Sequence, residues 1–355
     1  MPIFTRNLTI DVYRGLVMLL MMAEVLRLGR LAQAFPGNRI LDFFAFHQSH
    51  VQWEGCSLHD MIQPSFSFLV GVALPYALAN RPKPFLSALW RGLLLVAMGI
   101  FLRSMHAPQT NFTFEDTLTQ IGLGYPLLFL LARLKSKLQW GALVVLLVGY
   151  WAAWALYPLP DQPFAAHWWK AANLGVAFDY WFLNLFPRAT PFIANGGGYG
   201  TLSFIPTLGT MLLGLIAGQW LRAGRPLLLY FKTGALLIAI ALLLHFLGIC
   251  PIVKRIWTPA WTLFSGGLCL WLLAGFRYIL EIRGHTRWAF PLIVIGMNSM
   301  AAYWIAHVLP EFFTSSLRIH LGLYLPVAAI APPLVLLLEW WLLYWMYRRQ
   351  LFLKI

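Results

Sequence analysis

The sequence predicts an all-α, polytopic membrane protein with about ten transmembrane helices and both termini in the cytoplasm. Of its 355 residues, 60% are hydrophobic and 11% are charged, whereas soluble domains carry about 25% charged residues. The apolar residues are gathered into long runs, and the basic residues are concentrated in alternate connections between those runs. We expect the whole chain, residues 1–355, to form one transmembrane domain.

The membrane-spanning segments are assigned by length and apolar character, since a spanning helix needs about 20 mostly apolar residues. The first candidate segment is the least apolar, because it contains charged residues near both of its ends. The segments that meet the requirement are 10–29, 60–80, 86–106, 117–134, 139–158, 201–221, 227–250, 257–280, 287–309 and 323–347.

The orientation follows from the distribution of lysine and arginine. One set of alternate connections, which includes residues 81–91, 133–137 and 222–232, holds twice as many basic residues as the other set. Cytoplasmic loops are enriched in lysine and arginine, so this set and both termini are placed inside. The net charge of +14 is explained by this pattern, and we expect no nucleic-acid partner because the basic residues form no single patch.

Two long connections, residues 30–59 and 159–200, then face the outside, and long loops of this kind commonly carry function. The second connection contains aromatic residues that suit either a membrane interface or stacking on sugar rings. These residues are Trp168, Trp169, Tyr180 and Trp181. It ends in Asn195-Gly196-Gly197-Gly198, which lacks the ending of a phosphate-binding loop and predicts a flexible linker.

The first segment carries charges that are costly inside a membrane unless they face protein or water. Asp11 and Arg14 are three residues apart near its inner end, and Glu24 and Arg27 are three apart near its outer end. This spacing places each pair on one helix face, where opposite charges can neutralise each other. The pairs are therefore either structural ion pairs or functional groups.

Residues 47–60 hold the densest group of polar side chains in the chain, and three interpretations of it stay open. Ser57 and Asp60 fit a capping box at the start of the next helix. His47, His50, Cys56 and His59 are residue types that bind zinc, although their spacing matches no common zinc motif. A histidine oriented by Asp60 or Glu54 could instead act as a base or a transient acyl carrier.

Two segments resemble signature motifs of the heparan-alpha-glucosaminide N-acetyltransferase family of transmembrane enzymes. Residues 6–15, from Arg6 to Gly15, resemble its Arg-x-x-Ser-x-Asp-x-x-Arg-Gly motif, and residues 50–64 resemble its His-x-x-Trp-x-Gly…Asp-Leu-x-Phe-Pro motif. Weaker matches extend the likeness over nearly the whole chain. They are Phe68-Leu69-Val70-Gly71-Val72, Thr119-Gln120-Ile121-Gly122, Ile205-Pro206, Leu213-Gly214, Trp257-Thr258 and Gly296-Met297-Asn298-Ser299.

The chain departs from this family at three motif positions. Thr9 stands where the family has serine, Gln63 where it has phenylalanine, and Ile121 where it has arginine. The last departure removes a basic side chain, so no such role is expected at that position.

The resemblance implies an acetyl-CoA-dependent N-acetyltransferase in which His50 is the catalytic histidine and Asp60 its partner. Arg14 is implied by the first motif, and we expect it and Arg91, both near the predicted inner face, to hold the phosphates of acetyl-CoA. Acceptor contacts are expected from four further residues of the outer region and the motifs. These are Glu24, Trp53, Glu54 and Asn298.

The function expected from the sequence is transfer of an acetyl group from cytosolic acetyl-CoA to an amino-sugar-like or glycan acceptor outside the membrane. The expected partners are the lipid bilayer, acetyl-CoA and this acceptor, with no metal ion, and a homodimer is left open. The resemblance to bacterial relatives implies a multi-pass protein of the bacterial plasma membrane. The alternative is a sugar or glycolipid transporter or flippase without acyl transfer, since apolar spans with charged residues suit it equally.

Overall fold

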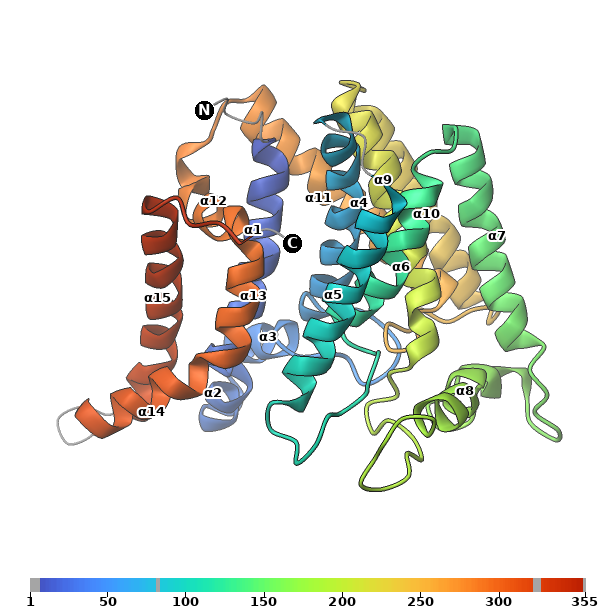
Figure 1. Cartoon of the computed structure of the whole chain (residues 1–355), viewed down its shortest axis with the longest axis horizontal. Coiled ribbons are helices and arrows are strands. Elements are labelled where there is room, and N and C mark those ends of the chain that lie inside the picture. The colour runs from blue at the N-terminus through green and yellow to red at the C-terminus, as the bar shows by residue number, and fades with distance from the viewer. Residues whose placement is uncertain (1–6, 81–83, 322–326, 354–355) are drawn as a thin grey trace. The chain divides into compact units, whose positions relative to one another are not determined.

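The computed structural model describes residues 7–80, 84–321 and 327–353, and the regular structure of these residues is helical without a strand (Figure 1). The predicted all-α class is therefore confirmed for the described residues. The helices are α1 (Leu8–Met22), α2 (Leu28–Ala34), α3 (Arg39–His47), α4 (Ile62–Asn80), α5 (Phe85–Ser104), α6 (Thr117–Leu131), α7 (Ser136–Ala155), α8 (Leu174–Leu183), α9 (Phe204–Arg222), α10 (Leu227–Phe246), α11 (Pro259–Arg277), α12 (Phe290–Met297), α13 (Ser299–Val308), α14 (Pro310–Leu321) and α15 (Val327–Arg348).

Seven helical segments in the described residues are long and apolar enough to cross a membrane, and an eighth results if α12 and α13 count as one bent span. Each of the eight coincides with a segment predicted from the sequence. The other two predicted segments, 10–29 and 117–134, form α1 and α6, which are only 15 residues long each. The count of ten spans and the cytoplasmic placement of both termini stay predictions.

The first helix ends earlier than the sequence predicts. Asn7 starts α1 by accepting a hydrogen bond from the Ile10 backbone N–H, but after Met22 the chain tightens into a short 3₁₀ helix, η1 (Ala23–Leu26). Arg27 then adopts a left-handed conformation with φ 48°, which no regular right-handed helix contains. Gln48 bonds to the Ala23 carbonyl and the Leu28 N–H, each at 2.6 Å, and so satisfies backbone groups that the break frees.

The chain falls into two compact units, and the prediction of a single domain stays a prediction. The first unit comprises residues 1–51, 56–62 and 272–355, and the second comprises residues 52–55 and 63–271.

In the first unit, α1 packs against α12 and α13, and α15 packs against α12, α13 and α14 (Figure 1). Glycines allow α1 and α12 to approach backbone to backbone. A Cβ atom added to Gly296 would lie 1.8 Å from the Asp11 carbonyl oxygen, and one added to Gly15 would lie 1.9 Å from that of Leu292. At Asn298 the chain bends by 74° between α12 and α13.

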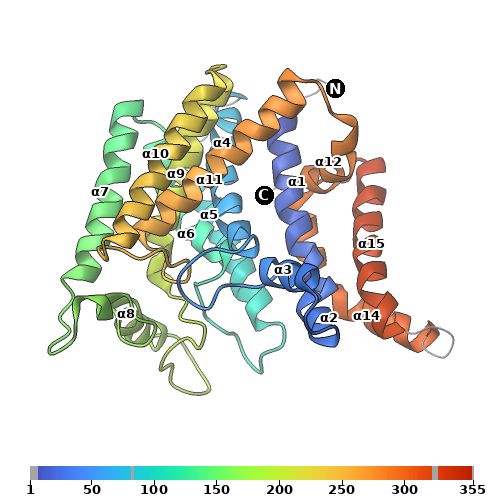
Figure 2. The same cartoon turned by 180° about the vertical axis from the view of Figure 1, so that it is seen from behind.

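In the second unit, α6 packs against α5 and α9, and α7 packs against α9. The Asp116 carboxylate starts α6 by accepting hydrogen bonds from the Leu118 and Thr119 N–H groups. Inside the unit, Gln63 donates to the side-chain oxygen of Gln120 at 2.9 Å, and Thr207 donates to the same oxygen at 3.1 Å. The short helix α8 lies near the C-terminal end of α7 (Figure 2).

Candidate functional site

Asp60 organises the loop between α3 and α4. Its Oδ2 atom accepts hydrogen bonds from the Val51 N–H at 3.2 Å, the Ser57 N–H at 3.0 Å and the Ser57 hydroxyl at 2.9 Å. The Asp60 N–H donates back to the Ser57 hydroxyl at 3.2 Å, which completes the capping box proposed from the sequence. The carboxylate is only 1% exposed, so its position is fixed by the surrounding loop.

The remaining carboxylate oxygen of Asp60 points to His50. His50 Nδ1 lies 2.8 Å from Asp60 Oδ1, while the imidazole itself stays 36% exposed. A buried acceptor at Nδ1 holds one ring orientation and favours the tautomer that is protonated at Nδ1. Asp60 thus caps the helix through Oδ2 and contacts His50 through Oδ1, and its role as an orienting carboxylate in catalysis stays a prediction.

His59 and Glu24 extend this group within the first unit. The ring of His59 lies 4.5 Å from that of His50, between centroids, and its Nε2 atom lies 3.2 Å from Glu24 Oε1. The predicted pairing of Glu24 with Arg27 is therefore replaced by a pairing with His59, because the helix that would have aligned Glu24 and Arg27 breaks at Arg27. The exposed Glu24 carboxylate joins the histidine pair from a different part of the chain.

The zinc interpretation of residues 47–60 finds no geometric support in the part of the chain that the structure describes. There, no group of three histidine, cysteine or acidic side chains is arranged to hold a metal ion. His47 Nδ1 accepts a hydrogen bond from the Leu58 N–H at 3.1 Å, and Cys56 Sγ contacts the Ser57 carbonyl at 3.3 Å.

The two arginines assigned to acetyl-CoA each have a neighbour within their own unit. Arg14 lies 3.4 Å from Asp11 in α1, so the predicted ion pair at the start of the first helix is present. Arg91 in α5 donates to the Tyr125 hydroxyl at 3.1 Å, and its guanidinium carbon lies 4.7 Å from the centre of the Tyr125 ring. Tyr125 therefore fixes the direction in which the Arg91 side chain extends.

Asn298 sits at the bend between α12 and α13 and is buried. Its Nδ2 atom donates to the Leu351 carbonyl at 2.9 Å, and its Oδ1 atom accepts from the Leu353 N–H at 3.1 Å. These bonds anchor the C-terminal segment to the bend. They give Asn298 a structural role that the sequence did not predict, and its expected acceptor contact stays a prediction.

Trp53 and Glu54 belong to the second unit. The Glu54 backbone forms an isolated bridge with Val253, and the neighbouring Gly55 N–H donates to the Ile252 carbonyl at 3.1 Å. Trp53 donates from its indole N–H to the Trp168 carbonyl at 2.9 Å. These long-range contacts hold the Trp53 ring in one place.

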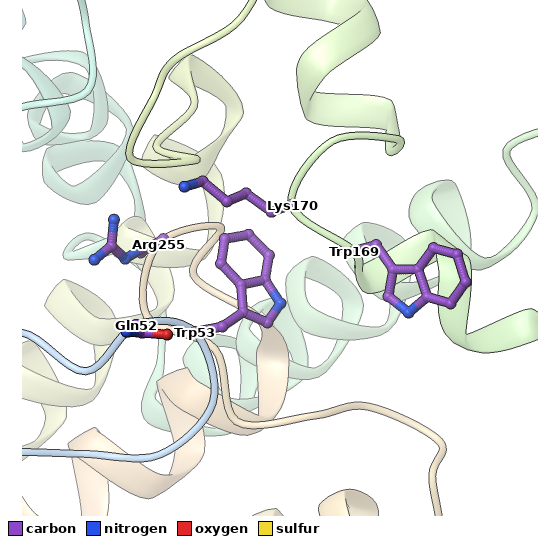
Figure 3. A pocket seen from close by; sticks show the side chains of 5 residues that line it. All are labelled: Gln52, Trp53, Trp169, Lys170 and Arg255. Carbon is purple, nitrogen blue, oxygen red and sulfur yellow. The ribbon is translucent and has the colours of Figure 1, made fainter.

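Trp53 forms one wall of a pocket of about 350 Å³ (Figure 3). The Lys170 side chain extends past the Trp53 ring toward the Arg255 side of the pocket, and Trp169 stands on the opposite side. None of the described residues that line the pocket is acidic. The lining residues are Gln52, Trp53, Trp169, Lys170 and Arg255.

The segment Asn195-Gly196-Gly197-Gly198 is a hydrogen-bonded turn against this pocket, so the predicted flexible linker is wrong. Asn195 Oδ1 accepts from the Gly197 N–H at 2.7 Å and the Tyr199 N–H at 3.3 Å. Gly198 has a φ of +79°, and a Cβ added there would lie 2.6 Å from the Trp53 ring. Its lack of a side chain lets the turn press directly on Trp53.

The other end of the Asn195 amide contacts an ionisable group, because Asn195 Nδ2 donates to Glu115 Oε1 at 3.0 Å. Burial raises the pKa of Glu115 to about 7, with the carboxylates of Asp116 and Asp179 acting in the same direction and Arg103 and Arg188 opposing them. The turn is thus held by a carboxyl group that titrates near neutrality.

Sequence reasoning paired Ser57 with Asp60 correctly, but it missed that Lys170 and Arg255 line a pocket together with Trp53. The capping spacing already pointed to Ser57. Lys170 and Arg255 were counted only as loop charges, and nothing local in the sequence connects them, since Arg255 lies far along the chain from Trp53.

No family model and no curated protein matches this chain. The fold therefore defines its class coarsely, as an all-helical chain with several helices long and apolar enough to cross a membrane.

Proposed function

We propose that the protein is an acetyltransferase embedded in a bacterial plasma membrane, moving an acetyl group from cytosolic acetyl-CoA to an amino-sugar-like acceptor outside. The observation that supports this most is the contact between His50 and Asp60. The buried Asp60 carboxylate makes four hydrogen bonds, one of them to the partly exposed imidazole of His50, which it orients. The resemblance of this loop to a membrane acetyltransferase motif is the reason for proposing acetyl transfer as the reaction.

The chemistry begins at the imidazole of His50. With Nδ1–H donating to Asp60, Nε2 is the basic nitrogen, and an amine acceptor must lose a proton before or while it attacks the acetyl carbonyl. In direct transfer, Nε2 takes this proton, the new C–N bond forms, the C–S bond of the thioester breaks, and the CoA thiolate leaves. In the two-step alternative, Nε2 first attacks the carbonyl, the C–S bond breaks and the CoA thiolate leaves. The amine then attacks the acetyl-imidazole, the bond between the acetyl carbon and Nε2 breaks, and Nε2 takes the amine proton.

Asp60 stabilises the positive charge that His50 acquires in either route. A carboxylate at 2.8 Å favours the imidazolium form. The hydrogen bonds of this carboxylate to Val51 and Ser57 hold it in place when the His50 ring moves. His59 and Glu24 stand on the neighbouring side of the His50 ring, so an ammonium acceptor approaching there meets a carboxylate. Glu24 is therefore proposed as an acceptor contact.

The proposal is tested with sealed membrane vesicles whose cytosolic face is turned outward and whose interior is loaded with glucosamine. Labelled acetyl-CoA added outside should yield N-acetylglucosamine inside and free CoA outside. Right-side-out vesicles given the same external acetyl-CoA should yield neither, because the donor site then faces the lumen. Product formed only in the right-side-out vesicles would contradict the orientation. If no member of a panel of amino sugars and amino-bearing glycans causes CoA to be released, the proposed activity is contradicted.

A donor-binding role is proposed for Arg91 and Arg14, which lie near the predicted inner face. Arg91→Gln should raise KM for acetyl-CoA about 10- to 100-fold, because a charged hydrogen bond contributes roughly 1.5–3 kcal/mol. The matched control is Arg103→Gln at the other end of α5, which removes the same charge on the predicted outer side. Equal KM values for the two variants would show that Arg91 does not contact the donor.

A transporter or flippase is the second candidate, favoured by the 74° bend between α12 and α13. Broken helices in transporters place unpaired backbone groups around a substrate. Here the Asn298 side chain is instead engaged by the backbone of the C-terminal segment. Vesicles that accumulate labelled glucosamine without releasing CoA would favour transport over acetyl transfer.

A further inference from the structure

We infer that the pocket formed by Gln52, Trp53, Trp169, Lys170 and Arg255 binds a sugar that carries an anionic group, such as a phosphate or a carboxylate. This inference deepens the proposed function, on which it rests for the identification of the sugar as the acceptor. The binding itself depends only on the pocket residues of the second unit.

The size of the pocket fits one substituted sugar ring. Its volume of about 350 Å³ is near the lower end of small-molecule sites, which span roughly 300–1,000 Å³. A polymer would need an extended groove, and a bare inorganic ion would leave most of this volume empty. A monosaccharide unit with one additional group is the ligand class that fills it.

The charge of the lining selects an anion. Lys170 and Arg255 supply two cationic groups, and the described lining residues include no carboxylate. Figure 3 shows the amine end of Lys170 extending toward the side of the Trp53 ring on which Arg255 lies. A planar guanidinium and an ammonium together offer several charged N–H donors, which suit phosphate or carboxylate oxygens.

The two tryptophans supply the surface for the sugar ring. Trp169 is 48% exposed and Trp53 borders the same pocket, so two indole rings are available to the apolar face of a pyranose. An interfacial anchor needs exposed indoles but no flanking cations in a pocket. The combination distinguishes this site from Trp181, which is 60% exposed in the same loop and does not line the pocket.

The pocket is also built in advance of binding. The Trp53 indole is fixed by the Trp168 carbonyl, and Gly198 presses on both the Trp53 ring and the Lys170 side chain. Arg255 is anchored by the Gly197 carbonyl and by the ring of Tyr199, 5.1 Å from its guanidinium carbon. A preorganised site of this kind loses less conformational entropy when a ligand binds.

The inference is tested by equilibrium binding to the purified full chain in phosphatidylcholine nanodiscs, without acetyl-CoA. The probes are glucosamine 6-phosphate, glucosamine and inorganic phosphate. We expect glucosamine 6-phosphate to bind at least about tenfold more tightly than glucosamine, as a charged hydrogen bond allows, and more tightly than phosphate. Acetyl transfer is not measured in this experiment. Absence of the expected binding would therefore overturn only this inference, and a protein that binds the probes but transfers no acetyl group would contradict only the proposed function.

Variants assign the binding to the pocket. Lys170→Gln should remove the preference for the phosphorylated probe, and Lys170→Arg should retain it. Trp169→Ala should weaken binding of both sugars, whereas Trp181→Ala should change neither. Equal affinity for glucosamine and its 6-phosphate, or an unchanged preference in Lys170→Gln, would overturn the inference. Loss of probe binding in nanodiscs that contain phosphatidylglycerol would overturn it in favour of a lipid headgroup.

Discussion

His50→Ala is expected to lower the rate of acetyl transfer at least about 100-fold while leaving acetyl-CoA binding unchanged. A general base contributes roughly 10²- to 10⁴-fold, and the loss is larger if His50 carries the acetyl group. The measurement is kcat with saturating acetyl-CoA, together with donor affinity measured separately. Near-normal turnover in this variant would remove His50 from the mechanism.

His47→Ala is the matched control for this experiment. His47 is the last residue of α3, just before the same loop, and its Nδ1 atom accepts a hydrogen bond from the Leu58 N–H, so it supports the loop from a different position than His50. We expect it to retain most of the activity. His59→Ala is a poorer control than the sequence indicated, because its ring lies against that of His50 and its Nε2 atom contacts Glu24.

The two roles of Asp60 can be separated by comparing it with its capping partner. Asp60→Asn alters both the cap and the contact with His50, whereas Ser57→Ala removes the cap and the bond to the Ser49 carbonyl but leaves the Asp60 oxygen that faces His50. Loss of a helix cap costs about 1 kcal/mol, so both variants should unfold more easily. Only Asp60→Asn should also lose turnover, and equal activities in the two variants would reduce Asp60 to a structural residue.

The sequence predicts the long apolar helices of this fold well because hydrophobic length is a local property, but it predicts none of the shorter helices α3, α8 and α14. Every predicted span corresponds to a helix or a bent helix pair. The errors come where one residue's conformation overrides the local pattern. Arg27 leaves the right-handed region and shortens the first span, and the bend at Asn298 divides another. Neither residue is glycine or proline, which are the strongest local signals of a break, although asparagine is also a common residue at helix ends.

The candidate site was predictable only in its local part. Asp60 and His50 are ten residues apart in one loop, and the capping spacing fixes much of their arrangement. The pocket around Trp53 depends instead on contacts with residues more than a hundred positions away, such as the Trp168 carbonyl. Tertiary packing brings these together, and a single sequence carries no signal for it.

The structure shows the contacts of Gln63, one position at which the chain departs from the acetyltransferase motif that it resembles. Gln63, where the family has phenylalanine, donates to Gln120, which also accepts from Thr207 in the buried interior of the second unit. An apolar side chain at position 63 would remove one of these bonds but leave the Thr207 bond in place. The substitution therefore changes a buried polar contact rather than a surface group.

Gly296→Ala is expected to destabilise the first unit strongly. The added Cβ would lie 1.8 Å from the Asp11 carbonyl oxygen and 2.9 Å from the Gly15 nitrogen, and both are backbone atoms that cannot rotate away. Helix α12 would have to move off α1, and overpacking of this kind costs typically 1–3 kcal/mol, occasionally more. Arg14, a proposed donor contact, lies on α1, which loses this packing partner, so donor binding should weaken as well.

The control is Gly275→Ala in α11, where the added Cβ meets nothing within 4 Å. There alanine should be neutral or stabilising by about 0.5–1 kcal/mol, because glycine is a poor helix former. The two variants are compared by thermal unfolding in the same detergent, with the fraction of protein that stays monodisperse as the measured quantity. Gly15→Ala should resemble Gly296→Ala, since its Cβ would lie 1.9 Å from the Leu292 carbonyl oxygen across the same contact. The double variant should cost less than the sum of the two, because the first substitution already separates the helices. Gly296→Ala melting at the temperature of Gly275→Ala would show that α1 and α12 do not pack through these glycines.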